Sequence, residues 1–194
     1  MKWRRETLPA QVRRAAAEAL VASAGVSEQS GPLGPDGTVS PVGPDGTRML
    51  AWGRRGEHYA LGFPGHLVYD DGTGWQVLAW HRIVRGGWDK DERRLTWIDY
   101  DGGRGALPLE EPGSLPELFR ERVEASIMVR RQVPVPGTKN GVIVVGRRVL
   151  GTGGAVLEWH ASLNKGTRWS DPGAREAAEA ALAELKADYD PYGG

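Results

Sequence analysis

Three residue types of a hydrolase triad stand close together near the C-terminal end of the chain. Glu158, His160 and Ser162 occupy alternate positions in the segment from Ala155 to Leu163. Apolar and polar residues alternate there, which predicts a strand in which side chains two residues apart are parallel and separated by ~6.6 Å. Nucleophilic catalysis requires side chains that converge. We therefore interpret these residues as the solvent-facing polar face of a strand.

The sequence also lacks the spacing of known metal and phosphate sites. The histidines follow no ligand pattern such as H-E-x-x-H, and His81, next to Trp80, is typical of a hydrogen-bonded histidine in or beside a core. Glycine follows Asp99 and Asp101 too early for a calcium loop. The glycine-rich residues 151–154 precede an expected strand, whereas a dinucleotide site opens a helix. The sequence thus predicts no catalytic residue, no metal and no cofactor.

A local excess of positive charge is the main functional signal. Residues 129–170 contain seven basic residues and one acidic residue. The candidate binding residues in this segment are Arg130, Arg131, Arg147, Arg148, Lys165, Arg168 and Trp169. They predict a solvent-facing surface that binds anions, which are either nucleic-acid phosphates or an acidic protein partner.

Two features limit the charge that this surface can present. Adjacent arginines in a strand point to opposite faces, so each of the pairs 130–131 and 147–148 divides between the two faces. Residues 171–194 carry six acidic and two basic residues, and a helix there could lie across the sheet and neutralise part of the charge. Both possibilities, an exposed basic surface and a partly neutralised one, stay open at this point.

The composition as a whole excludes several classes of protein. The 194 residues include 25 Lys and Arg, 25 Asp and Glu, and no cysteine. Balanced charge gives no global field that attracts nucleic acid or membrane, and the absence of cysteine excludes disulfides, thiol nucleophiles and iron–sulfur clusters. No apolar run approaches the ~20 residues that span a bilayer, and no secretory signal core follows the basic N-terminus. A cytoplasmic protein is expected.

The order of expected elements predicts an α+β fold, either an antiparallel β-rich meander or a PH-like barrel or roll, with about nine strands and three helices. An N-terminal helix ends near residue 24, and a Gly/Pro/Asp-rich linker covers 25–47. Residues 48–128 hold six strands, one of them running from Trp75 to Val84, and a helix with a capping box of Ser114 and Glu117. Residues 129–194 add three strands and a final helix, which we expect to belong to the same compact unit.

Part of the middle segment resembles the bacterial pleckstrin-homology-like (PH-like) proteins. The resemblance is carried by Trp75 to Asp89, by Arg94 to Trp97 and by the helix from Pro116 to Ile127, and it covers residues 48–128. It implies a binding scaffold, often for proteins or lipids, and carries over no catalytic residue. The chain departs from that family where three strands and a helix follow, and it also resembles uncharacterised conserved actinobacterial proteins.

The sequence therefore favours a non-enzymatic binding or adaptor protein that acts on protein partners. Its β-rich body would present a surface, and the N-terminal helix on its linker would reach a partner. The alternative is a nucleic-acid-binding protein that uses the basic segment 129–170. A third possibility, an enzyme with a small apolar pocket in the sheet, would need convergent polar groups that a sequence does not display.

Overall fold

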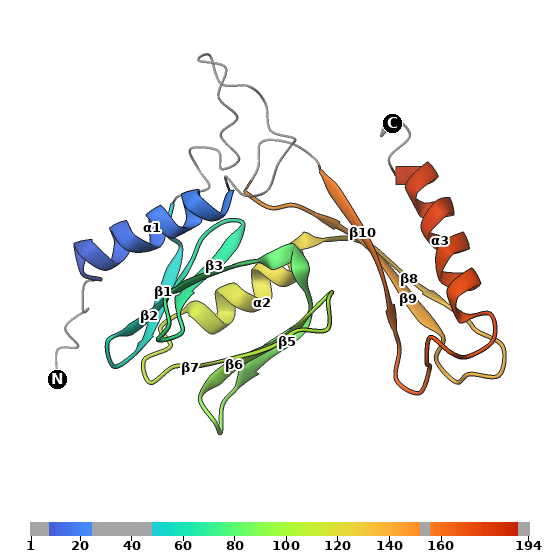
Figure 1. The fold of residues 1–194 in the computed structure, drawn as a ribbon, viewed down its shortest axis with the longest axis horizontal. Helices are drawn as coiled ribbons and strands as arrows, with labels where there is room; N and C mark the ends of the chain where they lie inside the picture. The colour runs from blue at the N-terminus through green and yellow to red at the C-terminus, as the bar shows by residue number, and fades with distance from the viewer. Residues whose placement is uncertain (1–7, 25–47, 152–155, 190–194) are drawn as a thin grey trace, which may run out of the picture.

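The computed structural model describes residues 8–24, 48–151 and 156–189, and within them the predicted α+β class with antiparallel strands is confirmed. The strands form three separate sheets instead of one closed roll (Figure 1). Ten strands are present in the described residues, one more than predicted. The linker expected at 25–47 lies outside the described residues.

The first sheet is a meander that carries the N-terminal helix on one face. Its strands, in the order β1-β2-β3-β4, are β1 (Ala51–Arg55), β2 (His58–Gly62), β3 (His66–Asp70) and β4 (Trp75–Ala79). Helix α1 (Ala10–Ala24) packs on β3 and β4. Ala16 and Leu20 of α1 are fully buried there in one apolar cluster with Leu61, Phe63 and Val68. Burial of this stripe is what holds the helix in place.

The long strand predicted from Trp75 to Val84 is wrong, because the 3-10 turn η2 (Trp80–Arg82) divides it. Trp80 is fully buried, and its indole Nε1 donates to the carbonyl of Phe63 at 2.8 Å. Anchoring this large side chain turns the chain out of the first sheet and into the second. Sequence alternation alone could not show this break.

The second sheet and helix α2 enclose the main core. The second sheet has the order β5-β6-β7, with β5 (Ile83–Asp89), β6 (Arg94–Asp99) and β7 (Arg104–Pro108). Helix α2 (Leu115–Ser126) contacts β1, β2, η2 and β5, and Leu115 and Phe119 carry it into the core. Ser114 begins the helix as predicted, but its side chain makes no capping hydrogen bond because its backbone is not extended.

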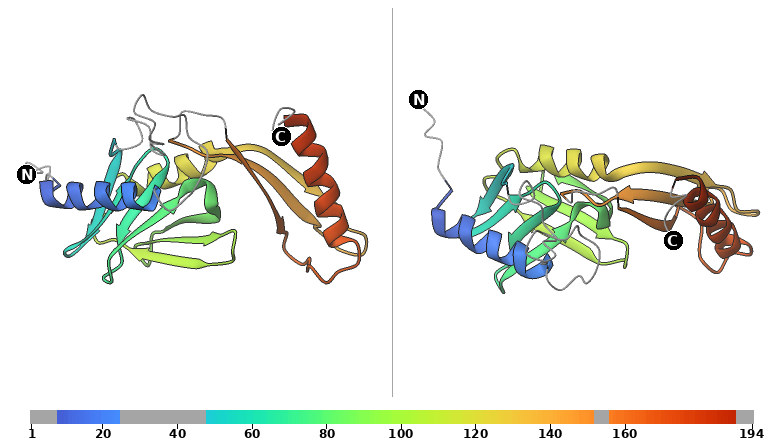
Figure 2. Two further views of the ribbon diagram at one scale, coloured as in Figure 1. Left: turned by 45° about the horizontal axis from the view of Figure 1, so that its top comes forward. Right: turned by 90° about the horizontal axis from the view of Figure 1, so that it is seen from above.

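The third sheet projects from this body and is covered on one face by the C-terminal helix (Figures 1 and 2). It has the order β10-β9-β8, with β8 (Ile127–Val133), β9 (Val142–Arg148) and β10 (Leu157–Leu163). Helix α3 (Ala174–Tyr189) packs Ala178, Ala181 and Leu185 against it. Trp159, Ala161 and Leu163 face α3, which confirms the predicted inward face of β10.

Candidate functional site

The third sheet has one face without a covering helix. Apart from α2, which continues into β8, the described element that packs substantially on this sheet is α3, on the other side. The strand register places two rows on the uncovered face, Arg130–Val145–His160 and Gln132–Ile143–Ser162. We call these six residues the open face. Ile143 and Val145 on the central strand are only half-buried, so the open face exposes an apolar stripe between two polar strands.

The predicted anion-binding residues do not form one surface. Arg131 faces α3 and pairs with Glu184 at 2.7 Å, so the acidic helix does neutralise part of the basic segment. Arg130 and Arg148 are exposed on opposite faces, as the strand geometry requires. Trp169 is half-buried beside the α3 core, with the guanidinium of Arg175 5.8 Å from its ring centre.

Arg147 overturns the expectation that the arginines of this segment face solvent. Its side chain is buried, and Nη1 donates to the carbonyl of Val123 at 3.1 Å and to Ser126 Oγ at 2.6 Å, while Nη2 donates to the carbonyl of Val84 at 3.4 Å. Val123 lies in the last turn of α2, where carbonyls lack helical donors and the helix dipole favours a cation. Arg147 therefore caps the C-terminal end of α2 with its guanidinium. It is not one of the surface residues that could bind an anion.

Lys165 and Arg168 lie at the end of the third sheet farthest from the body, which we call the tip. The tip consists of the loops 134–141 and 164–173. The side chain of Gln132 donates to the carbonyl of Asn140 at 2.8 Å, and the side-chain amide of Asn140 donates to the carbonyl of Lys165 at 2.5 Å. These bonds connect Gln132 of the open face to both loops of the tip, one of which carries Lys165.

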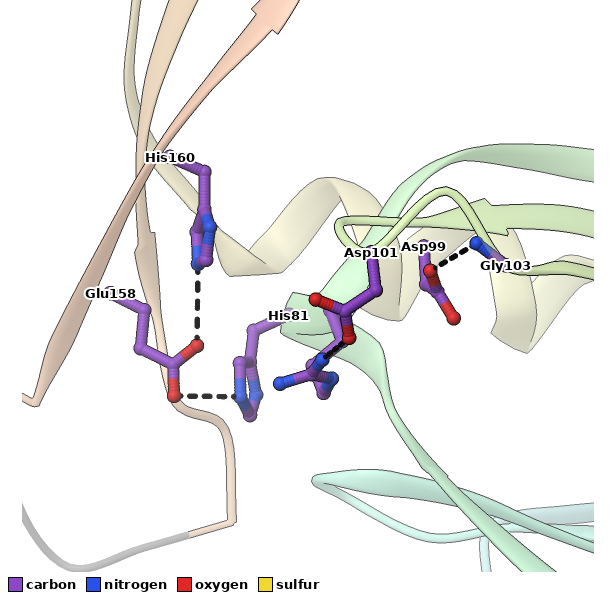
Figure 3. Close-up of polar contacts among 7 residues, drawn as sticks. His81, Asp99, Asp101, Gly103, Glu158 and His160 are labelled. Carbon is purple, nitrogen blue, oxygen red and sulfur yellow. Dashed lines mark hydrogen bonds and ion pairs between the residues drawn. The ribbon is translucent and has the colours of Figure 1, made fainter.

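A carboxylate joins two histidines where β10 meets the body (Figure 3). Glu158 Oε1 lies 3.2 Å from His81 Nε2, and Glu158 Oε2 lies 3.5 Å from His160 Nε2. His81 comes from η2 and is buried, whereas His160 stands on the open face with 29% of its side chain exposed. Hydrogen bonds from the two histidines keep the pKa of Glu158 well below its usual range, so this carboxylate stays ionised.

The ring of His160 also stacks on Tyr100, which follows β6. The two ring centres are 3.3 Å apart and the planes are inclined by only 10°. Burial raises the pKa of Tyr100 to about 12, so its phenol is neutral at ordinary pH. The prediction that Glu158 and His160 merely face solvent is thus wrong, because both pack against the body.

This arrangement is a polar contact between β10 and the body of the molecule, and it is not a nucleophilic site. Within the described residues, Ser162 makes no hydrogen bond to His160, in agreement with the spacing argument for a strand. The part of the chain that the structure describes contains no group of three His, Asp or Glu side chains that could hold a metal ion. Sequence reasoning missed His81 and Tyr100 as partners of Glu158 and His160, since they come from segments about 60 to 80 residues away.

A surface pocket of about 520 Å³ lies at another place, between the β1–β2 turn, the end of β3 and β7. Its wall includes Tyr59, Tyr69 and the ion pair of His58 with Asp70, whose atoms are 3.0 Å apart. The carboxylate of Asp70 also accepts the backbone amide of Gly72 at 2.9 Å. The polar groups of this wall therefore stabilise the turn that follows β3.

His66 gives a testable pH dependence of stability. Burial, with His81 nearby, lowers the pKa of His66 from 6.5 to about 4. The unfolded chain therefore binds a proton first as the pH falls below about 6.5, and stability is lost progressively until about pH 4. At about 1.4 kcal/mol per pKa unit the loss reaches roughly 3 kcal/mol. Urea unfolding at a series of pH values measures it.

The variant His66→Asn should flatten this part of the stability profile. His58 is exposed, so His58→Asn is the matched control and should leave the slope in place. An unchanged slope in His66→Asn would show that His66 is not the group that resists protonation.

Among the described residues, no helix is long and apolar enough to cross a membrane. Comparison of the chain with models of protein families, with curated proteins and with solved structures finds no match. Function therefore has to be inferred from the geometry of the chain itself.

Proposed function

We propose that this chain is a non-enzymatic binding protein whose open face holds an acidic, extended segment of a protein partner. The observation that carries the proposal is the uncovered apolar stripe of Ile143 and Val145, set between polar strands on a sheet that projects from the body. Exposed apolar surface rimmed by polar residues is a feature of protein-binding sites, and the stripe is partly exposed between two polar strands. A segment with alternating side chains matches the period of such a face.

The charge around the stripe favours an acidic occupant. Arg130 on β8 and Lys165 at the tip are exposed, and no carboxylate among the described residues pairs with either. Lys139 and Arg168, also exposed, stand on the two loops of the tip. A partner lying from His160 toward the tip would meet Arg130 first and Lys165 last. Complementary charge of this kind fixes orientation and speeds encounter.

Nucleic-acid binding is less well supported by the same side chains. A phosphate backbone needs a row of cations, and affinity for it rises with the number of phosphates neutralised. Arg147 is internal, Arg131 is paired with Glu184, and Arg148 lies on the other face from Arg130. The binding scaffold implied by the PH-like resemblance agrees with a protein partner. The three sheets do not close into a barrel, so the PH-like resemblance stays a proposal here.

The test is titration of a short fluorescein-labelled peptide in which Glu and Val alternate, followed by fluorescence anisotropy. The native chain should bind it, and a peptide with Lys in place of Glu should not bind. The double variant Arg130→Glu/Lys165→Glu should weaken binding about ten-fold or more, because like charges then face each other across the interface. Ile143→Asp, which charges the apolar stripe, should weaken binding as well.

The matched control is the double variant Arg148→Glu/Lys186→Glu, which makes the same change of net charge at two exposed residues, one on the other face of the sheet and one on α3. It should bind the acidic peptide as the native chain does. Equal loss of binding in this control would point to net charge instead of the open face. Tighter binding of a single-stranded DNA oligonucleotide that displaces the peptide would overturn the proposal in favour of nucleic acid.

A further inference from the structure

We infer that the acidic segment binds by adding a fourth strand to the third sheet, antiparallel to β8, along the edge that carries Arg130 and Gln132. The inference rests on the proposed function and deepens it, because it states how the backbone of the partner is held. β8 stands last in the order β10-β9-β8, so no strand lies beyond it among the described residues. An edge strand presents unpaired amides and carbonyls to an extended chain that approaches it.

The hydrogen bonds between β9 and β10 show which backbone groups of β9 face β8. On the β10 side, the amide of Val149 donates to the carbonyl of Val156 at 2.9 Å, and the amide of Asn164 donates to the carbonyl of Gly141 at 3.2 Å. The register between these two points is regular. Because backbone groups alternate in direction along a strand, the odd-numbered residues of β9 bond to β10 and the even-numbered residues bond to β8.

This pattern leaves two residues of β8 with outward-facing backbone groups. The even-numbered residues of β9 lie opposite Val129, Arg131 and Val133, which therefore bond inward. The amides and carbonyls of Arg130 and Gln132, which alternate with them, point away from the sheet. Across this edge, no hydrogen bond to these groups is formed by any residue that the structure describes. Both residues are exposed, so their backbone groups can pair with an added strand.

The charges along the edge select an acidic occupant. Arg130 lies on the open face, and Arg131 lies on the α3 side, where Glu184 already pairs with it. Opposite charges that face each other across two strands attract, and like charges repel. A second copy of β8 would bring arginines against arginines, whereas an acidic strand would place Glu beside Arg130. The other edge strand, β10, is half-buried throughout and carries the carboxylate of Glu158, which repels an acidic strand.

The position of the glutamates follows from the antiparallel geometry. A residue that exchanges hydrogen bonds with Arg130 lies directly opposite it and points its side chain to the same face. In a segment in which Glu and Val alternate, the glutamates then lie on the open face, and their own amides donate to the carbonyls of Arg130 and Gln132. The valines lie on the α3 side, and their amides point to solvent. The rest of a longer partner can then cover Ile143 and Val145.

The experiment is the anisotropy titration of the native chain with the alternating Glu/Val peptide and two methylated forms of it. One form carries an N-methyl group on every Glu amide, and the other carries one on every Val amide. Methylation of the Glu amides removes the donors that face β8, so binding should weaken about ten-fold or more. Methylation of the Val amides should leave the affinity within about two-fold of the original. The two forms have the same charge and the same number of methyl groups, so each is the matched control for the other.

The variant Gln132→Pro tests the same edge from the side of the protein. Proline has no amide hydrogen, and it is tolerated in an edge strand where the amide faces solvent. The variant should therefore fold, as circular dichroism can check, and should bind the unmethylated peptide about five-fold more weakly or worse. Gln132→Ala is the control, because it removes the side chain and its bond to Asn140 but keeps the backbone amide. It should bind as the native chain does.

The outcomes separate this inference from the proposed function. Equal binding of the two methylated forms overturns the added strand and leaves the open face as the binding site. Weaker binding of the Val-methylated form alone overturns the antiparallel arrangement. A native chain that does not bind the unmethylated peptide overturns the proposed function itself.

Discussion

Replacing Arg147 by Ala is expected to lower the free energy of unfolding by roughly 3–4 kcal/mol, because Ser126 Oγ and the partly buried carbonyl of Val84 lose their donor at about 1–3 kcal/mol each, whereas the carbonyl of Val123 keeps the Ser126 hydroxyl as a donor. The guanidinium joins three elements, since it donates to Val123 and Ser126 of α2 and to Val84 of β5. Its loss also removes the cation at the C-terminal end of α2. Urea unfolding followed by tryptophan fluorescence measures the change.

Arg148→Ala is the matched control for this experiment. Arg148 is the next residue of β9 and is exposed, so its removal should change stability by no more than about 0.5 kcal/mol. Equal stability of the two variants would contradict the role of Arg147 as the residue that caps the C-terminal end of α2. The comparison also tests whether Arg147 serves the fold and not a ligand, because Arg147→Ala should keep its affinity for the acidic peptide under conditions where it is folded.

Gly65→Ala should have the second largest effect, a loss of about 3 kcal/mol from steric overlap in a packed region. A Cβ atom at Gly65 would lie 2.2 Å from the carbonyl oxygen of Leu150 and 3.1 Å from its carbonyl carbon. Both atoms belong to the backbone, and the carbonyl of Gly65 is itself bound by the amide of Trp80 at 3.0 Å. Neither chain can move away without breaking the contact between the β2–β3 turn and the end of β9. Thermal unfolding followed by circular dichroism measures the loss.

The control for this substitution is Gly87→Ala in β5. A Cβ atom at Gly87 would meet nothing within 4 Å. The stability of this variant should be unchanged or slightly raised, since alanine restricts the unfolded chain more than glycine does. If Gly65→Ala were as stable as Gly87→Ala, the close approach of the two backbone segments would not exist in solution.

Local patterns predicted most of the secondary structure but not the division into sheets. The alternation in β10 gave the correct inward face, since period-two patterning reports directly on burial. The same reasoning merged β4 and β5, because the buried Trp80 fits a strand pattern as well as it fits a turn. Whether the strands close into a roll depends on contacts between distant segments, which local patterns do not contain.

The candidate site was predictable only in part for the same reason. Strand geometry predicted correctly that Arg147 and Arg148 point to opposite faces of the sheet. The pairing of Arg131 with Glu184 corresponds to the partly neutralised surface, which was one of the two possibilities that the sequence left open. The burial of Arg147 depends on the end of α2 lying beside it, and the contacts of Glu158 depend on His81 of η2. Charge counting along the chain carries no information about which cations have internal partners.

The direct passage from α2 into β8 has a mechanical consequence. Helix α2 ends at Ser126 and β8 begins at Ile127, with no connecting loop between them. The third sheet is therefore joined to α2 without a flexible connection, and its orientation follows from the axis of a helix that is packed in the main core. A partner bound to that sheet would therefore be held at a fixed angle to the rest of the molecule.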